Sequence, residues 1–115
     1  MSGPEWYKRD PRRALRGMAK LTLEQRGFYQ TIQDMIYDEG GPIDDDERHI
    51  AGQMQVSLRK YRSVRDALIA AGRIARGDDG RLYDDACSET LEDWRRVRDA
   101  QSVGGAEGGR RSGQV

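Results

Sequence analysis

The chain has very few of the residues from which catalytic and metal sites are built. Its 115 residues include one cysteine and one histidine. Cys87 can form no internal disulfide and has no second thiol for a zinc ribbon, so we expect it to be a small buried apolar residue. His49 has no other His or Cys near it in sequence, which favours a surface position over a role as ligand or base. The sequence therefore predicts no catalytic residue, no metal and no cofactor, and hence a protein that is not an enzyme.

Long apolar runs are also missing. No stretch of 18 apolar residues occurs, and the first residues do not have the basic-then-apolar pattern of a signal peptide. Neither membrane insertion nor secretion is indicated, so we expect no membrane contact and a cytoplasmic location. With 36% hydrophobic and 35% charged residues, the chain has apolar material for one small domain with a thin core.

An excess of either charge is missing as well, which at first argues against a polyanionic partner. The net charge is zero, but the two signs are segregated along the chain. Residues 1–26 carry 7 basic and 3 acidic side chains, and residues 57–76 carry 6 and 1, whereas residues 27–56 carry 1 and 7. Because distant charges are screened at physiological salt, each basic block can still present a positive surface to phosphates.

Two helices are predicted before residue 57. Thr22 and Gln25 form a T-x-x-Q capping box, and the apolar periodicity after it predicts a helix from Leu23 to Glu39 that ends at two glycines. A short second helix follows, and four carboxylates at residues 44–47 precede it. We interpret these carboxylates as helix caps, because the alternating ligand spacing of a calcium loop is absent.

A third, basic helix is predicted after residue 57. Its apolar residues Tyr61, Val64 and Leu68 fall on one side and are expected to be buried, whereas Arg59 and Arg62 fall on the opposite side. This pattern is typical of a recognition helix in the major groove of DNA, although the cations of an amphipathic helix can also serve only to solvate it. The DNA hypothesis requires both arginines to be exposed and not paired with carboxylates. The expected DNA contacts on this helix are Ser57, Arg59, Lys60, Arg62 and Ser63.

A tight hairpin is predicted over residues 73–83, with Asp79 and Gly80 in its turn. Arg76 and Arg81 lie near its tip, where we expect them to contact a sugar-phosphate backbone. Acidic residues in the turn oppose that role, and a purely structural hairpin is the alternative.

The rest of the chain is predicted to be a helix followed by a tail. Cys87, Leu91, Trp94 and Val97 belong to one apolar stripe of a helix that begins near residue 84. This helix is expected to pack on its own domain, with a two-fold homodimer seam as the alternative. The predicted organisation is a basic segment at 1–21, whose structure the sequence does not decide, a winged-helix domain with its C-terminal helix at 22–101, and a disordered glycine-rich tail at 102–115. The predicted fold class is mainly α with a small β-hairpin, that is, a winged helix-turn-helix plus a C-terminal helix.

Short motifs in a fixed order also carry a family resemblance, which extends from about Trp6 to Arg98. The motif residues are Leu21, Leu23, Glu24, Arg26 to Tyr29, Ile36, Tyr37, Gly40 to Asp45, Ile50, Ala51, Tyr61, Leu68, Ile69 and Gly72 to Ile74. In these residues the chain resembles a family of small proteins often encoded by phages and prophages, the YdaU-like family or domain of unknown function 1376. The resemblance implies a winged-helix fold and a role near DNA in phage or prophage replication initiation or gene control, without assigning catalytic residues.

Two functions are consistent with these observations. The first is a non-enzymatic protein that binds double-stranded DNA, with the third helix in the major groove and the hairpin on the adjacent backbone. The alternative is an adaptor whose acidic block, Asp34 to Glu47, docks on a basic face of a replisome or transcription protein.

Overall fold

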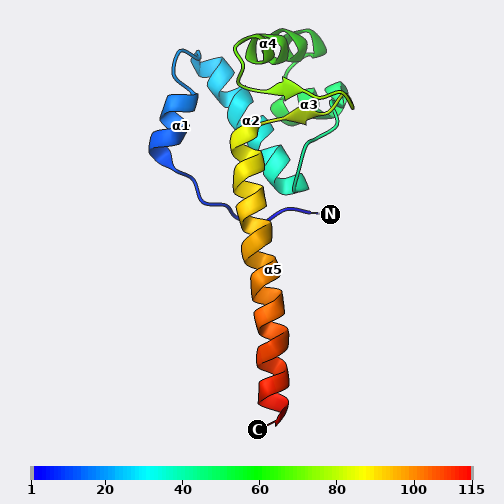
Figure 1. Ribbon diagram of the computed structural model, residues 1–115. Coiled ribbons are helices and arrows are strands. Elements are labelled where there is room, and N and C mark those ends of the chain that lie inside the picture. The colour runs from blue at the N-terminus through cyan, green and yellow to red at the C-terminus, as the bar shows by residue number, and fades with distance from the viewer. Residues whose placement is uncertain (1, 115) are drawn as a thin grey trace.

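The computed structural model describes residues 2–114, and the side chains of residues 2–101. Within residues 2–114 the chain forms five helices and one two-stranded antiparallel sheet (Figure 1). In chain order the elements are α1 (Pro11–Gly17), α2 (Leu23–Glu39), α3 (Glu47–Met54), α4 (Leu58–Ala70), β1 (Ala75–Arg76), β2 (Leu82–Tyr83) and α5 (Asp85–Gln114). The prediction of a mainly α fold with a small β-hairpin is confirmed.

Local capping determines where the central helix α2 begins and ends. The Thr22 hydroxyl accepts from the Gln25 amide at 3.2 Å, and the Thr22 amide donates to the Gln25 side chain at 3.0 Å. At the other end Gly40 adopts the left-handed conformation (φ 85°), which terminates the helix without the strain a Cβ would cause. The helix therefore has the bounds that the capping box and the glycines predict.

The core lies where α2, α3, α4 and the first turns of α5 meet the hairpin. Ile32 of α2, Ile50 of α3, Tyr61 of α4 and Leu91 of α5 are each 1% exposed or less. Leu82 of β2 is completely buried in the same cluster. These residues hold the helices around one small core, as the composition predicts.

The sheet is extended by one residue beyond the hairpin. Ala75 pairs with Tyr83 and Arg76 with Leu82, and the chain turns through Gly80 (φ 79°). Ile43 forms an isolated antiparallel bridge with Leu82, with N···O distances of 3.2 and 2.8 Å. The bridge fixes the chain just before α3 against the hairpin.

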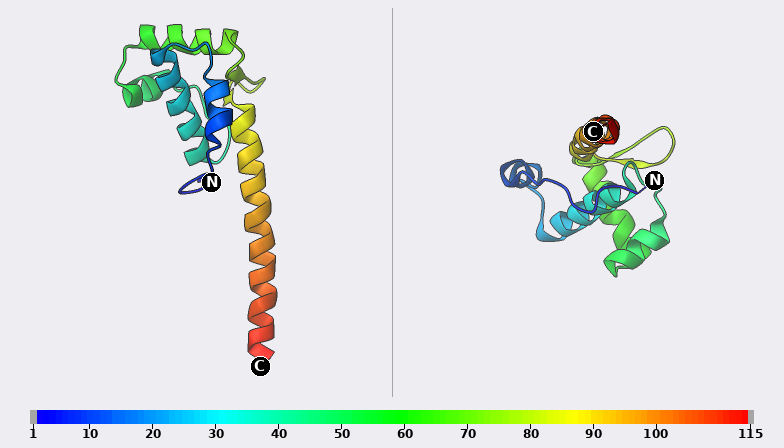
Figure 2. Two further views of the ribbon diagram at one scale, coloured as in Figure 1. Left: turned by 90° about the vertical axis from the view of Figure 1, so that its left-hand side faces the viewer. Right: turned by 90° about the horizontal axis from the view of Figure 1, so that it is seen from below.

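The N-terminal segment is attached to the body rather than separate from it. The Tyr7 ring stacks on Tyr37 with centroids 3.7 Å apart, and Arg13 of α1 pairs with Glu89 of α5 at 2.7 Å. Helix α1 lies on one side of α2, and α3 lies on the other side (Figures 1 and 2). The side of α2 that faces α1 is therefore distinct from the side that faces α3.

Helix α5 leaves the body after its first turns and extends away from it (Figure 1). Cys87 is completely buried, as expected, and Trp94 is half-buried. The prediction that Val97 continues the inner stripe is wrong, because its side chain is 56% exposed where α5 has passed the core. The sequence predicts a disordered tail from residue 102, whereas the structure continues α5 to Gln114. The side chains of 102–115 lie outside the described residues. Among the described residues, no helix has both the length and the apolar character needed to cross a membrane.

Candidate nucleic-acid interface

Helix α4 has the orientation that its sequence predicts. Tyr61, Val64 and Leu68 point into the core and are 0%, 5% and 1% exposed. Arg59 and Arg62 are exposed on the outer side of the helix. Because Tyr61, Val64 and Leu68 point inward, only the residues on the opposite side of α4 are accessible to a ligand.

The first turn of α4 combines a capping hydroxyl with cations. Ser57 is the N-cap, and its hydroxyl accepts from the Lys60 amide at 3.1 Å. The Lys60 ammonium pairs with Glu24 at the start of α2, at 3.0 Å. Arg59 has no ion pair or hydrogen bond to any side chain of residues 2–101. Ser63 is exposed one turn further along the helix.

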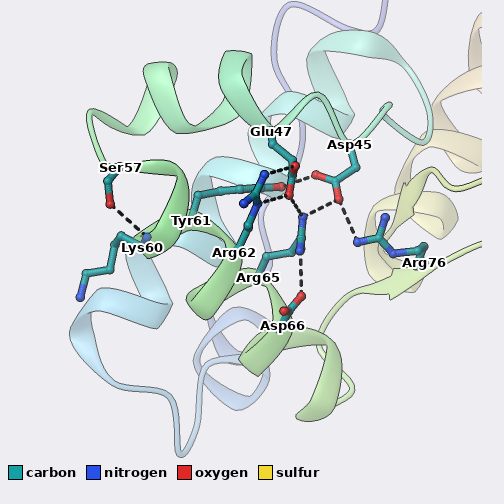
Figure 3. A network of polar contacts seen from close by, with 9 residues as sticks. All are labelled: Asp45, Glu47, Ser57, Lys60, Tyr61, Arg62, Arg65, Asp66 and Arg76. Carbon is teal, nitrogen blue, oxygen red and sulfur yellow. Dashed lines mark hydrogen bonds and ion pairs between the residues drawn. The ribbon is translucent and has the colours of Figure 1, made fainter.

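A network of carboxylates and arginines connects α4 to the start of α3 and to the hairpin (Figure 3). Its centre is Asp45, whose side chain is 6% exposed. The Tyr61 hydroxyl donates to Asp45 at 2.7 Å, and Arg65 and Arg76 each donate to it at 2.9 Å. Three donors satisfy one buried carboxylate and connect the segment before α3 to both α4 and β1.

Glu47, the first residue of α3, holds two arginines of α4. Arg62 donates to both of its carboxylate oxygens, at 2.9 and 3.0 Å, and Arg65 donates at 2.7 Å. The hydrogen bonds from Arg62 and then Arg65 lower the pKa of Glu47 to about 2. Burial opposes the charged form of Arg65, but its hydrogen bonds to Glu47 and Asp66 outweigh burial and raise its pKa.

Acidic residues before α3 also hold the two arginines of the hairpin. Arg76 pairs with Asp45 at 2.9 Å, and Arg81 pairs with Asp44 at 3.2 Å. The two arginine side chains keep 41% and 52% exposure. The acidic residue that caps α3 is Asp46, which accepts from the His49 amide at 3.2 Å. The interpretation of the acidic run as a helix cap therefore holds for Asp46, while its neighbours pair with arginines.

The predicted DNA contacts thus differ in their availability. The requirement of an exposed arginine without a carboxylate partner is met at Arg59 and is not met at Arg62, because Glu47 binds Arg62 through both oxygens. Lys60, Arg76 and Arg81 also have carboxylate partners. The cationic surface that the sequence predicts on α4 and the hairpin is largely neutralised by the acidic block.

Sequence reasoning missed Arg65, which is 9% exposed and joins the network from within. The signal was present, because Arg65 follows Tyr61 by four residues and therefore lies on the same, inward side of α4. A charge at a core-facing position needs a partner, and the acidic block is the nearest source of one along the chain.

An open groove lies along the acidic block, between α2 and α3. It has a volume of about 680 Å³. Its acidic lining residues are Asp34, Asp38, Glu39, Asp44 and Asp46, and its cation is Arg81. The groove therefore has a predominantly negative wall, formed by residues of α2, of α3 and of the segment between them.

Comparison with known protein families gives a match. A family model described as a protein of unknown function, DUF1376, matches residues 5–92. The match begins before α1 and ends within α5, so it includes the basic N-terminal segment and the whole network around Asp45. No curated protein and no solved structure matches the chain.

Proposed function

Because the chain belongs to the DUF1376 family, whose function is unknown, its role has to be inferred from its own residues, and we propose that it is a non-enzymatic protein of winged-helix type that binds double-stranded DNA. On this proposal α4 enters the major groove, and the hairpin lies on the neighbouring sugar-phosphate backbone. The family resemblance supports a setting in phage or prophage replication initiation or gene control.

The connection between α3 and α4 supports a helix-turn-helix. Three residues, 55–57, join the two helices, and Gln55 takes the left-handed conformation (φ 58°) that glycine often supplies in such turns. The hairpin follows α4 directly, and Ile43 fixes it against the segment before α3. Helix, turn, helix and hairpin are therefore held as one unit.

The observation that carries the proposal is the exposed outer side of the first two turns of α4. Ser57, Arg59 and Ser63 present hydroxyls and a guanidinium outward, and Arg59 has no side-chain partner within residues 2–101. Hydroxyls bind phosphates, and an arginine can also pair with guanine in the major groove. Exposed ion pairs contribute at most about 1 kcal/mol, so phosphates can compete for Lys60 and Arg81, whose pairs are exposed. Arg76 keeps 41% exposure, but its partner Asp45 is buried.

A duplex titration at low salt tests this proposal. We expect Arg59→Ala with Arg62→Ala to weaken duplex binding more than tenfold, since contacts from cations to phosphate or base carry much of the affinity. The matched control is Arg48→Ala with Arg96→Ala, which removes the same charge from α3 and α5. An equal response of the two double variants would remove α4 from the interface.

The acidic groove favours a second candidate function, the adaptor. Five carboxylates line an open groove of about 680 Å³, which is complementary in charge to a basic face of a replisome or transcription protein. Asp38→Asn with Glu39→Gln, both in the lining of the groove, should then weaken capture of such a component and leave a duplex titration unchanged. Co-purification of that component, together with no duplex binding at low salt, would favour the adaptor over the DNA-binding protein.

A further inference from the structure

Three cations without a carboxylate partner among the described residues lie close together on α1 and the loop after it. Arg12, Arg16 and Lys20 are exposed, and none of the three side chains has an ion pair or hydrogen bond to another side chain of residues 2–101. Asp10 is the only acidic residue from position 6 to position 23. Its carboxylate accepts from two backbone amides at the start of α1. The positive charge of this region is therefore not neutralised by its neighbours.

This basic region has a fixed position on the body. Arg13 pairs with Glu89 of α5 at 2.7 Å, and the Tyr7 hydroxyl donates to Asp34 of α2 at 2.6 Å. Met18, just after α1, packs against the core, and Leu21 is 8% exposed. A ligand of α1 would therefore not have to order a flexible segment, which reduces the entropic cost of binding.

The same region continues to α4. Arg73, just beyond α4, donates to the Ala19 carbonyl at 3.2 Å, and Lys60 near the start of α4 pairs with Glu24 at 3.0 Å. The chain between α1 and α2 consequently runs along α4, as the left view of Figure 2 shows. Lys20 lies in this stretch, with φ 67°, so the loop after α1 brings a basic residue close to α4.

We propose that Arg12, Arg16 and Lys20 form a second contact surface for the phosphate backbone of double-stranded DNA, next to α4. Arg12 and Arg16 are one helical turn apart on the same side of α1, which suits contacts along one strand. Such contacts read no sequence but contribute affinity by releasing condensed counterions. The proposal rests on the proposed function in that it names the same partner, and it assigns much of the electrostatic affinity to α1 instead of α4.

The test is a fluorescence titration of random duplex DNA at several salt concentrations, with the full chain. Arg12→Gln, Arg16→Gln and Lys20→Gln together should weaken binding at least about tenfold at low salt. The slope of log affinity against log salt should become shallower by about 2 to 3, since each phosphate contact contributes about 0.9 to it. The matched control is Arg48→Gln, Arg96→Gln and Arg98→Gln, which removes the same charge from α3 and α5.

Each outcome separates this inference from the proposed function. A weaker and shallower titration for the α1 variant, but not for the control, supports the α1 surface even if Arg59→Ala with Arg62→Ala binds normally. Equal titrations for the α1 variant and the control overturn it, while the proposed function stands if the α4 variant is weakened. If the wild-type chain does not bind duplex DNA at low salt, both proposals fail. Circular dichroism of each variant distinguishes lost binding from lost folding.

Discussion

The two basic regions of this protein are both rich in arginine but lie in different environments. On α4 and the hairpin, most cations are held by carboxylates that come from the segment before α3 and from its first residue. On α1, Arg12 and Arg16 have no such partner within residues 2–101. The comparison shows that arginine serves structure in one region and leaves charge available in the other. The position of the acidic block, on the α3 side of α2, is the cause of the difference.

The largest effect should come from the buried centre of the α4 network. Asp45→Asn removes the charge that Tyr61, Arg65 and Arg76 share, so we expect a loss of about 3 kcal/mol in the free energy of unfolding. Urea denaturation at pH 7 measures it. The matched control is Asp44→Asn, because Asp44 is 83% exposed and pairs only with Arg81 among the described side chains. Equal stabilities of the two variants would show that burial does not distinguish the two carboxylates.

A smaller effect should come from Glu47, as a dependence on pH. Its folded pKa of about 2 is below the usual value of 4.5, so its contribution to stability is complete above about pH 4.5 and is lost as the pH falls toward 2. Between pH 5 and pH 3 the wild-type chain should therefore lose more stability than Glu47→Gln. Glu24→Gln should keep the wild-type dependence, because an exposed pair contributes little. Parallel pH profiles for all three proteins would contradict this prediction.

The smallest effect should come from the α1 surface. Arg12→Gln with Arg16→Gln should leave the free energy of unfolding within about 0.5 kcal/mol of the wild type, because no ion pair of the described residues is lost. Thermal and urea unfolding at neutral pH measure it. A clear loss of stability would mean that these two cations are structural as well, and the contrast between the two regions would no longer hold.

Much of the fold could be predicted because it depends on local signals. The capping box at Thr22 predicts the start of α2, and Tyr61, Val64 and Leu68 predict the buried side of α4. The hairpin turn at Gly80 follows from residue type alone. These features involve residues close together in sequence, so periodicity and turn chemistry are sufficient to predict them.

The candidate site was less predictable because its main contacts are between distant residues. Arg62 and Glu47 are 15 positions apart, and Arg76 and Asp45 are 31 positions apart. Counting charges in blocks shows that basic and acidic segments alternate, but it does not show which segments meet in the fold. The helical state of 11–17 was likewise undecided in the sequence, although Asp10 and Pro11 form a capping signal there. Val97 was misplaced because periodicity predicts which side of a helix is apolar and does not predict where the core ends.

The network around Asp45 contains one exposed arginine and one buried arginine of α4. The exposed arginine can leave the network while the buried one stays in place. Arg62 is half-exposed and reaches only Glu47 among the described side chains, whereas Arg65 is nearly buried and also reaches Asp45 and Asp66. If a phosphate drew Arg62 away, Arg65 would still connect α4 to the segment before α3. The outer arginine can therefore exchange its partner while the helix that carries it keeps its place.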